Sequence, residues 1–227
     1  MDKVIAIILN YNTSRDCEKC LSYLCKQDYD ELSIVIVDNA SPNAGEKQYL
    51  QLLKNKYDFN LIFNKNNFGF SAGNNIGLKW AKEQGYDWAL IINPDVELRD
   101  THYISKVMTQ KNKWKDVAVI GTNVILPTGE RQNPQRESTY LESIMWPIEM
   151  LKTKISKRNR YLCENIDGYC DKVTGACFFI KMSFVEIINY LDENVFMYSE
   201  EAILGAQVKK HNMKELYLNS ITANHEH

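Results

Sequence analysis

Short apolar runs alternate with amphipathic or polar segments along the first half of the chain. Residues 4–9 and 88–92 are continuous apolar runs of strand length, which is typical of parallel strands buried on both faces. Residues 33–37 and 59–63 are two further runs of this kind. We therefore expect these runs to form buried strands, each of which ends abruptly in polar residues.

The segments between these runs favour helices. Residues 16–25 and 46–54 are compatible with helices, Thr13-Ser14 offers an N-cap to the first, and a third helix is expected through residues 81–84. Strands and helices thus alternate with short connections. This order predicts an α/β fold in which a mostly parallel central sheet carries helices on both faces.

The second half of the chain has a less regular pattern. Its predicted strands are residues 117–126, 173–180 and 216–221. Residues 127–130 predict a turn, and Ser199 is a candidate N-cap for a helix that reaches about His211. Neither an internal repeat nor a low-complexity linker divides the sequence. One domain spanning residues 1–227 is the simplest organisation.

Composition and charge are ordinary for a globular protein. Of the 227 residues, 44% are hydrophobic and 25% are charged, and the formal net charge is −2. Since no strong overall field attracts polyanions, we expect no binding to nucleic acid. The six cysteines include one CxxC pair, Cys17 and Cys20, without a second pair or a nearby histidine. Reduced thiols of a cytosolic protein are therefore expected.

Targeting signals are not visible in the sequence. No signal-peptide pattern precedes the first predicted strand, and no apolar run approaches the ~20 residues of a membrane-spanning helix. We expect a cytoplasmic protein that is soluble or attached only at the inner face of the membrane. The basic residues 152–160 usually would form a solvated surface, but they could also contact lipid head groups or an anionic acceptor.

Polar side chains follow the predicted strands of the first half: Asn10 and Tyr11, Asp38, Asn67, and Asp95. Because ligands of open α/β sheets bind at the carboxyl ends of the strands, these residues are expected to line one crevice. Asp95 suits a Mg²⁺ or Mn²⁺ ion that bridges two phosphates, and Asp38 suits a ribose hydroxyl or a base N–H. Each is equally compatible with an ordinary aspartate in a turn.

Residues 66–77 are rich in Asn and Gly, but they match neither a P-loop nor a GxGxxG fingerprint. Their glycines recur every four residues, which suits a helix packed closely on a sheet. We expect this packing role for Gly73 and Gly77, and we place Asn67 and Gly69 nearer the ligand. The absence of GxGxxG after the first strand also disfavours a Rossmann oxidoreductase.

Carboxylates and histidines in the last part of the chain are candidates for chemistry. Glu200 and Glu201 follow Ser199 at a predicted helix start, where the helix dipole alone stabilises carboxylates by ~0.3–1 kcal/mol. A general base aimed into the crevice would look the same in the sequence. A metal role for His225 requires the last strand to return to the crevice.

Six segments in this order resemble family 2 glycosyltransferases with the GT-A fold, especially bacterial rhamnosyltransferase-like enzymes of surface polysaccharide assembly. The matching segments are residues 8–12 (ILNYN), 35–41 (VIVDNAS), 67–77 (NFGFSAGNNIG), 90–96 (LIINPDV), 173–180 (VTGACFFI) and 196–201 (FMYSEE). Each segment alone is weak evidence. Their common order along nearly the whole chain makes the resemblance strong.

The resemblance implies a nucleotide-sugar site in the first half. Asn10, Tyr11 and Asp38 would hold the base and the ribose of the donor. Asp95 matches the last acidic position of the family's DxD-type metal motif, in which Asn93 replaces the first Asp, as in members with an NPD sequence. The further residues placed at this site are Asn67, Gly69, Asn93 and Gly175.

The resemblance also implies the catalytic machinery. Glu201 falls where the family has its catalytic Asp, with Glu200 as the alternative, and His225 resembles the late metal-binding histidine of the family. Members usually continue well past this histidine, whereas this chain ends two residues later. The chain is therefore expected either to be truncated or to lack C-terminal helices that contact a membrane.

The implied enzyme is a Mg²⁺- or Mn²⁺-dependent, inverting glycosyltransferase. Its donor would be a UDP- or dTDP-linked sugar bound by residues 1–100, and its acceptor a glycan or a polyprenyl-linked glycan bound by residues 101–227. An inactive nucleotide-sugar- or glycan-binding module is the first alternative. A nucleotidyltransferase is less favoured, because residues 10–16 offer only Arg15 to a triphosphate.

Overall fold

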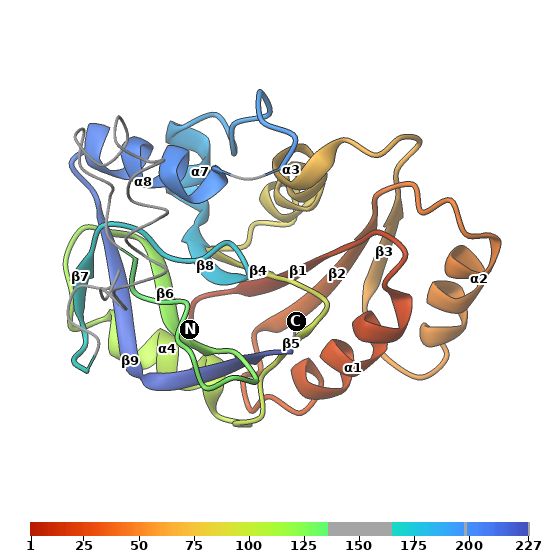
Figure 1. Ribbon diagram of the computed structural model, residues 1–227, viewed down its shortest axis with the longest axis horizontal. Helices are drawn as coiled ribbons and strands as arrows, with labels where there is room; N and C mark the ends of the chain where they lie inside the picture. Colours follow the sequence, from red (N-terminus) through yellow and green to blue (C-terminus); the bar gives the residue numbers. More distant parts are fainter. Residues whose placement is uncertain (136–164, 198, 227) are drawn as a thin grey trace, which may run out of the picture.

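The computed structural model describes residues 1–135, 165–197 and 199–226, which are built around one curved sheet (Figure 1). Along the sheet the strands follow the order β3-β2-β1-β4-β8-β6-β9-β5, and β7 pairs with β9. The strands are β1 Val4–Asn10, β2 Leu32–Asp38, β3 Asn60–Phe63, β4 Trp88–Ile92, β5 Val96–Glu97, β6 Val117–Ile125, β7 Gly168–Cys170, β8 Cys177–Lys181 and β9 Lys214–His225.

Strand direction differs between the two halves of the sheet. The predicted parallel strands β1 to β4 are confirmed, and β1 lies between β2 and β4 in parallel register. Beyond β4, the pairings β4·β8, β6·β8, β5·β9 and β7·β9 are antiparallel, and only β6·β9 among the described strands is parallel. The chain enters β8 beside the carboxyl end of β4, so β8 must run in the direction opposite to β4. The sheet that the sequence predicts to be mostly parallel is thus mixed: its first half is parallel, and its second half is antiparallel apart from the β6·β9 pairing.

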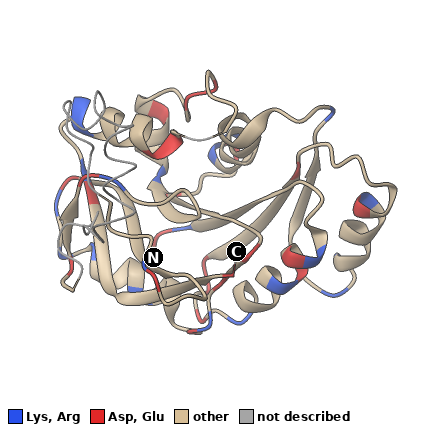
Figure 2. Cartoon of the chain, viewed as in Figure 1, with Lys and Arg blue, Asp and Glu red and all other residues tan. Residues whose placement is uncertain are grey.

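Helices cover both faces of the sheet, as the alternating pattern predicts. The helices are α1 Ser14–Leu24, α2 Ala44–Leu53, α3 Gly69–Glu83, α4 Tyr103–Lys111, α7 Met182–Ile187 and α8 Glu200–Lys210. Alternate residues of β1 point to opposite faces. Ala6 and Ile8 belong to the core shared with α1, α2 and α4, whereas Ile5 and Ile7 belong to the core shared with α3, α7 and α8. Charged residues lie mainly on helices and loops, and the central strands carry few (Figure 2).

Helix α3 packs unusually close to the sheet, which confirms the packing role expected for its glycines. A Cβ added to Gly73 would lie 2.7 Å from Leu9 Cδ1, and one added to Gly77 would lie 2.6 Å from Ile7 Cγ2. Carbon atoms cannot approach so closely without displacement. The two glycines therefore bring the start of α3 against the carboxyl end of β1.

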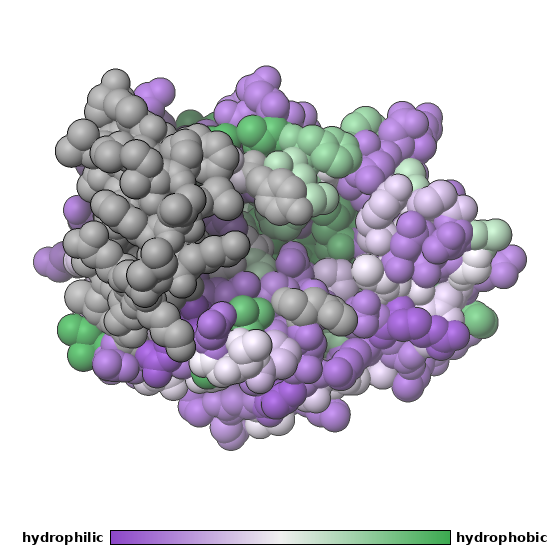
Figure 3. Space-filling model, viewed as in Figure 1, coloured by the Kyte–Doolittle hydropathy of each residue, from purple (hydrophilic) through white to green (hydrophobic). Residues whose placement is uncertain are grey.

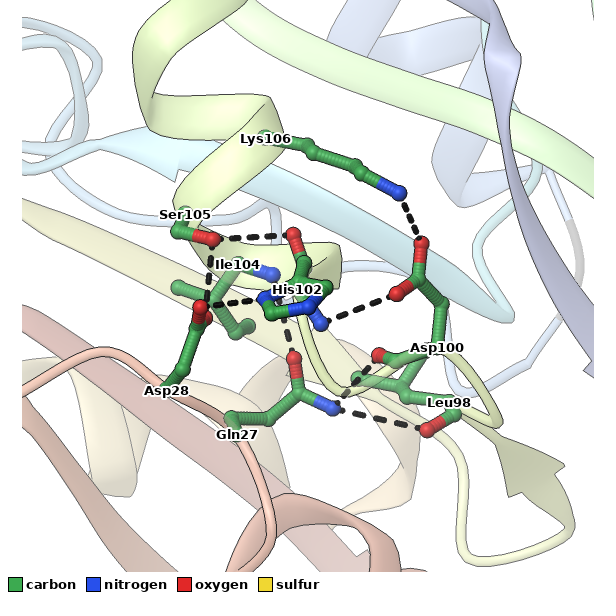
Figure 4. A network of polar contacts seen from close by, with 8 residues as sticks. All are labelled: Gln27, Asp28, Leu98, Asp100, His102, Ile104, Ser105 and Lys106. Atoms are coloured by element: carbon green, nitrogen blue, oxygen red, sulfur yellow. Dashed lines mark hydrogen bonds and ion pairs between the residues drawn. The ribbon is translucent and has the colours of Figure 1, made fainter.

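A polar network fixes the connection between α1 and β2 to the start of α4 (Figure 4). Gln27 Nε2 donates to the Asp100 carbonyl at 2.9 Å, and Gln27 Oε1 accepts from the Ile104 amide at 3.1 Å. The side chains of Asp28 and His102 contact each other, and this hydrogen bond lowers the pKa of Asp28. The network satisfies backbone groups at a helix start that have no intrahelical partner.

Replacing Gln27 by Ala should destabilise the fold by about 1–2 kcal/mol, because the Asp100 carbonyl and the Ile104 amide both lose a partner. Urea unfolding followed by circular dichroism measures this change. The exposed Gln51 on α2 provides the matched control, and Gln51→Ala should change stability by no more than about 0.5 kcal/mol. Equal midpoints for the two variants would contradict the role given to Gln27.

Candidate active site

The ends of β1 and β2 are joined by a buried network around Asn10 and Asp38. Asn10 Nδ2 donates to Asp38 Oδ1 at 2.8 Å, and Asn10 Oδ1 accepts from the Thr13 amide at 3.1 Å. The Ser41 hydroxyl donates to Asp38 Oδ1 at 2.6 Å. Both Asn10 and Asp38 are 0% exposed, so in this structure they hold the loops that border the crevice, whereas Tyr11 is 44% exposed on its rim.

Asn39 is a residue that sequence reasoning missed. Its side chain is buried and bonds Asn64, the Phe68 amide and Asn67, thereby tying the ends of β2 and β3 to the start of α3. Asn67 in turn accepts from the Gly69 amide at 2.9 Å. The signal available in the sequence was an amide side chain directly after Asp38, within the matching segment 35–41.

Gly69 meets the loop that precedes α8. Its φ is +81°, a conformation that favours glycine, and an added Cβ would lie 2.3 Å from the Phe196 carbonyl oxygen. The Phe70 amide donates to the same oxygen at 2.9 Å. Gly69 thus holds the loop around Phe196 against α3, and this contact brings the start of α8 to the crevice.

The two candidate metal ligands lie together. Asp95 follows β4, and His225 lies at the end of β9, where it pairs with Val96 of β5. His225 Nε2 is 3.3 Å from Asp95 Oδ2, and the Glu226 amide donates to the Asp95 carbonyl at 3.0 Å. The last strand therefore returns to the crevice, which is the condition that a metal role for His225 requires.

The chemistry of this pair fits Mg²⁺ or Mn²⁺. Both ions accept carboxylate oxygen, Mn²⁺ also accepts imidazole nitrogen, and metal–ligand bonds of about 2.0–2.2 Å place neighbouring ligands about 3 Å apart. The 3.3 Å separation of the two atoms is compatible with one shared ion. Within the described residues, no group of three or more His, Cys, Asp or Glu side chains is arranged for a metal. An ion here would need phosphate oxygens or water to complete its coordination.

An ion-pair cluster holds β5 against β9 beside this pair. Arg99 Nε is 2.7 Å from Glu97 Oε2, Arg99 Nη2 is 2.8 Å from Glu226 Oε1, and Lys19 contacts the other oxygen of Glu97. Burial acts to raise the pKa of Glu97, but the hydrogen bonds from Lys19 and Arg99 outweigh it and leave that pKa lowered. The cluster fixes the strand ends that carry Asp95 and His225.

Glu201 reaches the same edge of the sheet from α8. Glu201 Oε1 accepts from the Gly175 amide at 3.0 Å, and a Cβ added to Gly175 would crowd that oxygen at 3.2 Å. The carbonyl of the next residue, Ala176, accepts from the Asn93 amide at 2.8 Å. Since Asn93 lies two residues before Asp95, Glu201 and Asp95 belong to the same edge of the sheet.

Glu200 remains close to Glu201 in the structure. Ser199 precedes α8 as its N-cap residue, with φ of 75° and without a side-chain cap. Glu200 Oε1 is buried and has no hydrogen-bond partner among the described residues. A pocket between α3 and α8 is lined by Phe70 and Gly175 together with both glutamates. Both carboxylates therefore line this pocket, and of the two Glu201 is held by a hydrogen bond from the Gly175 amide.

The structure thus brings the predicted site residues to one edge as two adjoining groups. The first group lies at or just after the carboxyl ends of β1, β2 and β3. It contains Asn10, Tyr11, Asp38, Asn67 and Gly69. The second lies across β4, β8 and β9 and contains Asn93, Asp95, Gly175, Glu200, Glu201 and His225. Figure 3 shows a hollow on the face toward the viewer, with apolar side chains along its upper border. The basic residues 152–160 lie outside the described residues.

Comparison with known proteins identifies the family. The model of glycosyl transferase family 2 matches residues 5–184. The chain belongs to this family. The match covers Asp38, Asp95 and Gly175, whereas α8 and β9 lie outside it. None of the helices in the described residues of this family 2 chain is long and apolar enough to cross a membrane.

Two curated relatives resemble this family 2 chain at low identity. One is the low-salt glycan biosynthesis hexosyltransferase Agl10 of Haloferax volcanii, which is 25% identical over 218 residues, that is, over 94% of this chain and 64% of the relative. The other is the N-acetylglucosaminyl-diphospho-decaprenol L-rhamnosyltransferase of Mycobacterium tuberculosis, which is 21% identical over 240 residues, 99% of this chain and 76% of the relative. The chain thus spans less than two thirds of the length of the first relative.

Solved structures confirm the predicted α/β GT-A fold of this family 2 chain. The mannosyltransferase PcManGT of Pyrobaculum calidifontis, in complex with GDP-Man and Mn²⁺, aligns with a TM-score of 0.67 and 13% identity over 98% of this chain and 56% of that one. S. aureus TarS 1-349 in complex with UDP-GlcNAc aligns with a TM-score of 0.69 and 16% identity over 99% of this chain and 58% of that one. At these identities the similarity establishes the fold.

Proposed function

We propose that the chain is an inverting, metal-dependent glycosyltransferase that moves a sugar from a nucleotide diphosphate onto a hydroxyl of a glycan or polyprenyl-linked acceptor in the synthesis of a surface polysaccharide. The observation that carries this proposal is the shared edge: the Asp95 and His225 pair and the Glu201 carboxylate lie around the ends of β4, β8 and β9. The relatives named above act on a glycan or on a decaprenol-linked sugar, which supports the acceptor class.

Residues 1–100 would bind the donor. The exposed ring of Tyr11 can stack on the nucleotide base, and the network of Asn10, Asp38 and Asn39 holds the three loops around it in place. A UDP- or dTDP-linked sugar is proposed. GDP-Man and UDP-GlcNAc are bound by two proteins of this fold. A test of donor binding should therefore include UDP-, dTDP- and GDP-linked sugars.

Asp95 and His225 would hold Mg²⁺ or Mn²⁺, and the bound ion would neutralise the charge that develops on the leaving diphosphate. PcManGT, a protein of the same fold, is in complex with Mn²⁺, which supports this cofactor. Side chains and backbone groups of the protein would activate the acceptor hydroxyl. The Gly175 N–H, just before β8, holds one oxygen of Glu201, which leaves the other oxygen to accept a proton.

Glu201 would act as the general base. Its carboxylate would take the proton of the acceptor hydroxyl as that oxygen attacks the anomeric carbon from the face opposite the diphosphate. A single displacement inverts this carbon and needs no nucleophile on the protein. Residues 101–227 would bind the acceptor, because α8 and the loop around Gly175 belong to this half.

The structure does not favour a nucleotidyltransferase. Arg15 is the only basic residue in 10–16, and its guanidinium carbon lies 3.8 Å above the centre of the Tyr49 ring. This cation–π contact occupies the side chain that a triphosphate would need.

Nucleotide sugars should raise the thermal unfolding temperature of the protein only when Mn²⁺ is present. A ligand at 100 times its dissociation constant stabilises a fold by about 2.7 kcal/mol. A panel of UDP-, dTDP- and GDP-sugars, each with and without Mn²⁺, measures this effect and names the donor. Asp95→Ala should remove the part of the shift that depends on Mn²⁺, whereas the exposed Asp30→Ala should keep it.

Three results would count against the proposal. Absence of a shift with every donor would refute nucleotide-sugar binding, and a full Mn²⁺-dependent shift in Asp95→Ala would remove Asp95 from the metal site. Donor binding without any Mn²⁺-dependent hydrolysis or transfer would indicate a binding module in place of an enzyme.

A further inference from the structure

A tight hairpin after β6 carries Gln132 to the candidate metal pair. The Leu126 amide donates to the Glu130 carbonyl at 2.8 Å, which closes the turn, and the Gln132 amide donates to the Val124 carbonyl at 2.9 Å. Strand β6 is paired in parallel with β9, and Ile125 lies opposite Asn224. Because β9 ends at His225, this pairing fixes Gln132 beside the histidine.

The side chain of Gln132 meets the imidazole on the side away from Asp95. Gln132 Oε1 is 2.7 Å from His225 Nδ1, whereas His225 Nε2 is 3.3 Å from Asp95 Oδ2. An amide oxygen can only accept a hydrogen bond, so Nδ1 must carry the proton. In a neutral imidazole the other nitrogen, Nε2, is then unprotonated and can bind a metal.

We propose that Gln132 is a positioning residue, which holds His225 as the Nδ1–H tautomer and so presents the unprotonated Nε2 as a metal ligand beside Asp95. This inference rests on the proposed metal-dependent function. Metal-binding histidines generally donate their second ring N–H to a partner of this kind, and loss of that partner weakens metal binding about 10–100-fold.

The distances from the two ring nitrogens of His225 to their partners distinguish the Nδ1–H tautomer from the Nε2–H tautomer. If Nε2 carried the proton, it would donate to the Asp95 carboxylate, and bonds of that type are about 2.7–2.9 Å long. The observed 3.3 Å is longer than this range, whereas the 2.7 Å contact with Gln132 is a short hydrogen bond. The geometry thus assigns the ring proton to the side of Gln132.

The next residue anchors this hairpin to the loop that receives the candidate base. Asn133 is fully buried, its Nδ2 donates to the Thr122 carbonyl at 2.9 Å, and its Oδ1 accepts from the Thr174 amide at 2.7 Å. Thr174 precedes Gly175, whose amide holds Glu201. Two adjacent residues of one hairpin therefore have related roles: Gln132 positions the candidate metal ligand His225, and Asn133 positions the loop that holds the candidate general base Glu201. Because Asn133 anchors the hairpin, Gln132 has little freedom to move away from His225.

The test compares Gln132→Leu, which removes the acceptor in a similar volume, with Gln132→Glu, which keeps it. Two-dimensional ¹⁵N NMR of the imidazoles, with the His225 signals assigned by their loss in His225→Ala, reports the tautomer at a pH where the ring is neutral. Mn²⁺ alone, followed by electron paramagnetic resonance, reports affinity. We expect the wild type and Gln132→Glu to show protonated Nδ1, and Gln132→Leu to show a mixture of tautomers and about 10–100-fold weaker Mn²⁺ binding.

Gln51→Leu on the exposed face of α2 is the matched control and should retain both readouts. A wild type with protonated Nε2, or a Gln132→Leu variant with unchanged tautomer and affinity, would overturn the inference. Failure of the metal site itself is distinguishable, because Mn²⁺ binding would then be unaffected by Asp95→Ala. Thermal unfolding of each variant confirms that the fold is intact, and Gln132→Glu provides the comparison if Gln132→Leu is destabilised.

Discussion

Replacing Glu201 by Gln should lower the rate of sugar transfer by about 10²–10⁴-fold and leave donor binding unchanged, because a positioned general base contributes an acceleration of this size. The substitution suits the site. The Gln oxygen can still accept the Gly175 amide bond that Glu201 accepts at 3.0 Å, so the loop keeps its partner while the proton acceptor is lost.

The matched variant is Glu200→Gln, one residue away on the same helix start. Hydrolysis of the donor that the thermal-shift panel identifies is a suitable readout, because the same base would activate water, and calorimetric titration of that donor measures binding. The assignment predicts a large loss for Glu201→Gln and a small one for Glu200→Gln. The reverse order would transfer the role to Glu200, and near-normal turnover in both variants would refute a carboxylate base on α8.

Replacing Glu215 by Gln should stabilise the protein at neutral pH. Glu215 lies on β9 and is 3% exposed, and Gly205 of α8 packs over it, where an added Cβ would lie 3.4 Å from Oε1. Burial raises the pKa of Glu215 well above the usual 4.5. A hydrogen bond with the Val173 backbone and the charge of Lys209 oppose this rise, and the charge of Asp171 reinforces it. The folded protein therefore keeps this carboxyl protonated at pH values where the unfolded chain loses the proton.

The direction in which stability changes with pH follows from the number of protons that the folded and unfolded states bind. Below about pH 4.5 both states hold the proton, so the free energy of unfolding is fully retained there. As the pH rises toward the folded pKa, the native state binds more protons than the unfolded state, and stability falls by up to about 1.4 kcal/mol per pH unit. Glu215→Gln removes this loss, so its stability should depend less on pH.

Urea unfolding at a series of pH values between about 4.5 and 8 tests this prediction. The exposed Glu83→Gln on α3 serves as the control and should follow the wild-type pH dependence. If Glu215→Gln is less stable than the wild type throughout this range, the carboxylate is ionised and paired in the folded state, and the prediction is wrong.

The first half of the fold could be predicted because its signals are local. The apolar run 88–92 coincides with β4, and the helix expected near residues 81–84 is the end of α3, which starts at Gly69. Helix α4 was missed although Tyr103, Ile104, Val107 and Met108 form a buried helical face. The two-residue β5 and the three-residue β7 carry too few residues for any periodicity.

Errors in the second half have a physical reason. The sequence predicts a strand over residues 173–180, but β8 begins only at Cys177. Thr174 is β-branched and looks like a strand residue, yet its amide donates to Asn133 and the Gly175 amide donates to Glu201. Contacts with residues far along the chain thus remove these amides from the sheet.

Some residues of the candidate site could be predicted from the sequence, and others could not. Asp38, Asp95 and Asn67 could be found because they follow apolar runs, and resemblance to the family supplied His225 and Glu201. Gln132 beside the site and the buried Glu215 elsewhere on β9 have no comparable signal, because their surroundings arise from the pairing of β6 with β9 and from the packing of α8 on β9. Their roles are visible only when those elements are in place.

The path of the chain across the sheet has a mechanical consequence for Asp95. Between β4 and β5 lie β8, β6 and β9, so in a flat sheet the chain would have to cover four interstrand spacings, about 19 Å. The steps from Ile92 to Val96 span at most about 14 Å. The sheet must therefore curl until its two parts meet, and the register shift between β6 and β9 after Thr122 is the kind of irregularity that bends strands. Asp95 lies in a turn that the Val96 amide closes by donating to the Asn93 carbonyl at 3.1 Å, so its main chain is already ordered and capturing a cation there would cost little ordering entropy.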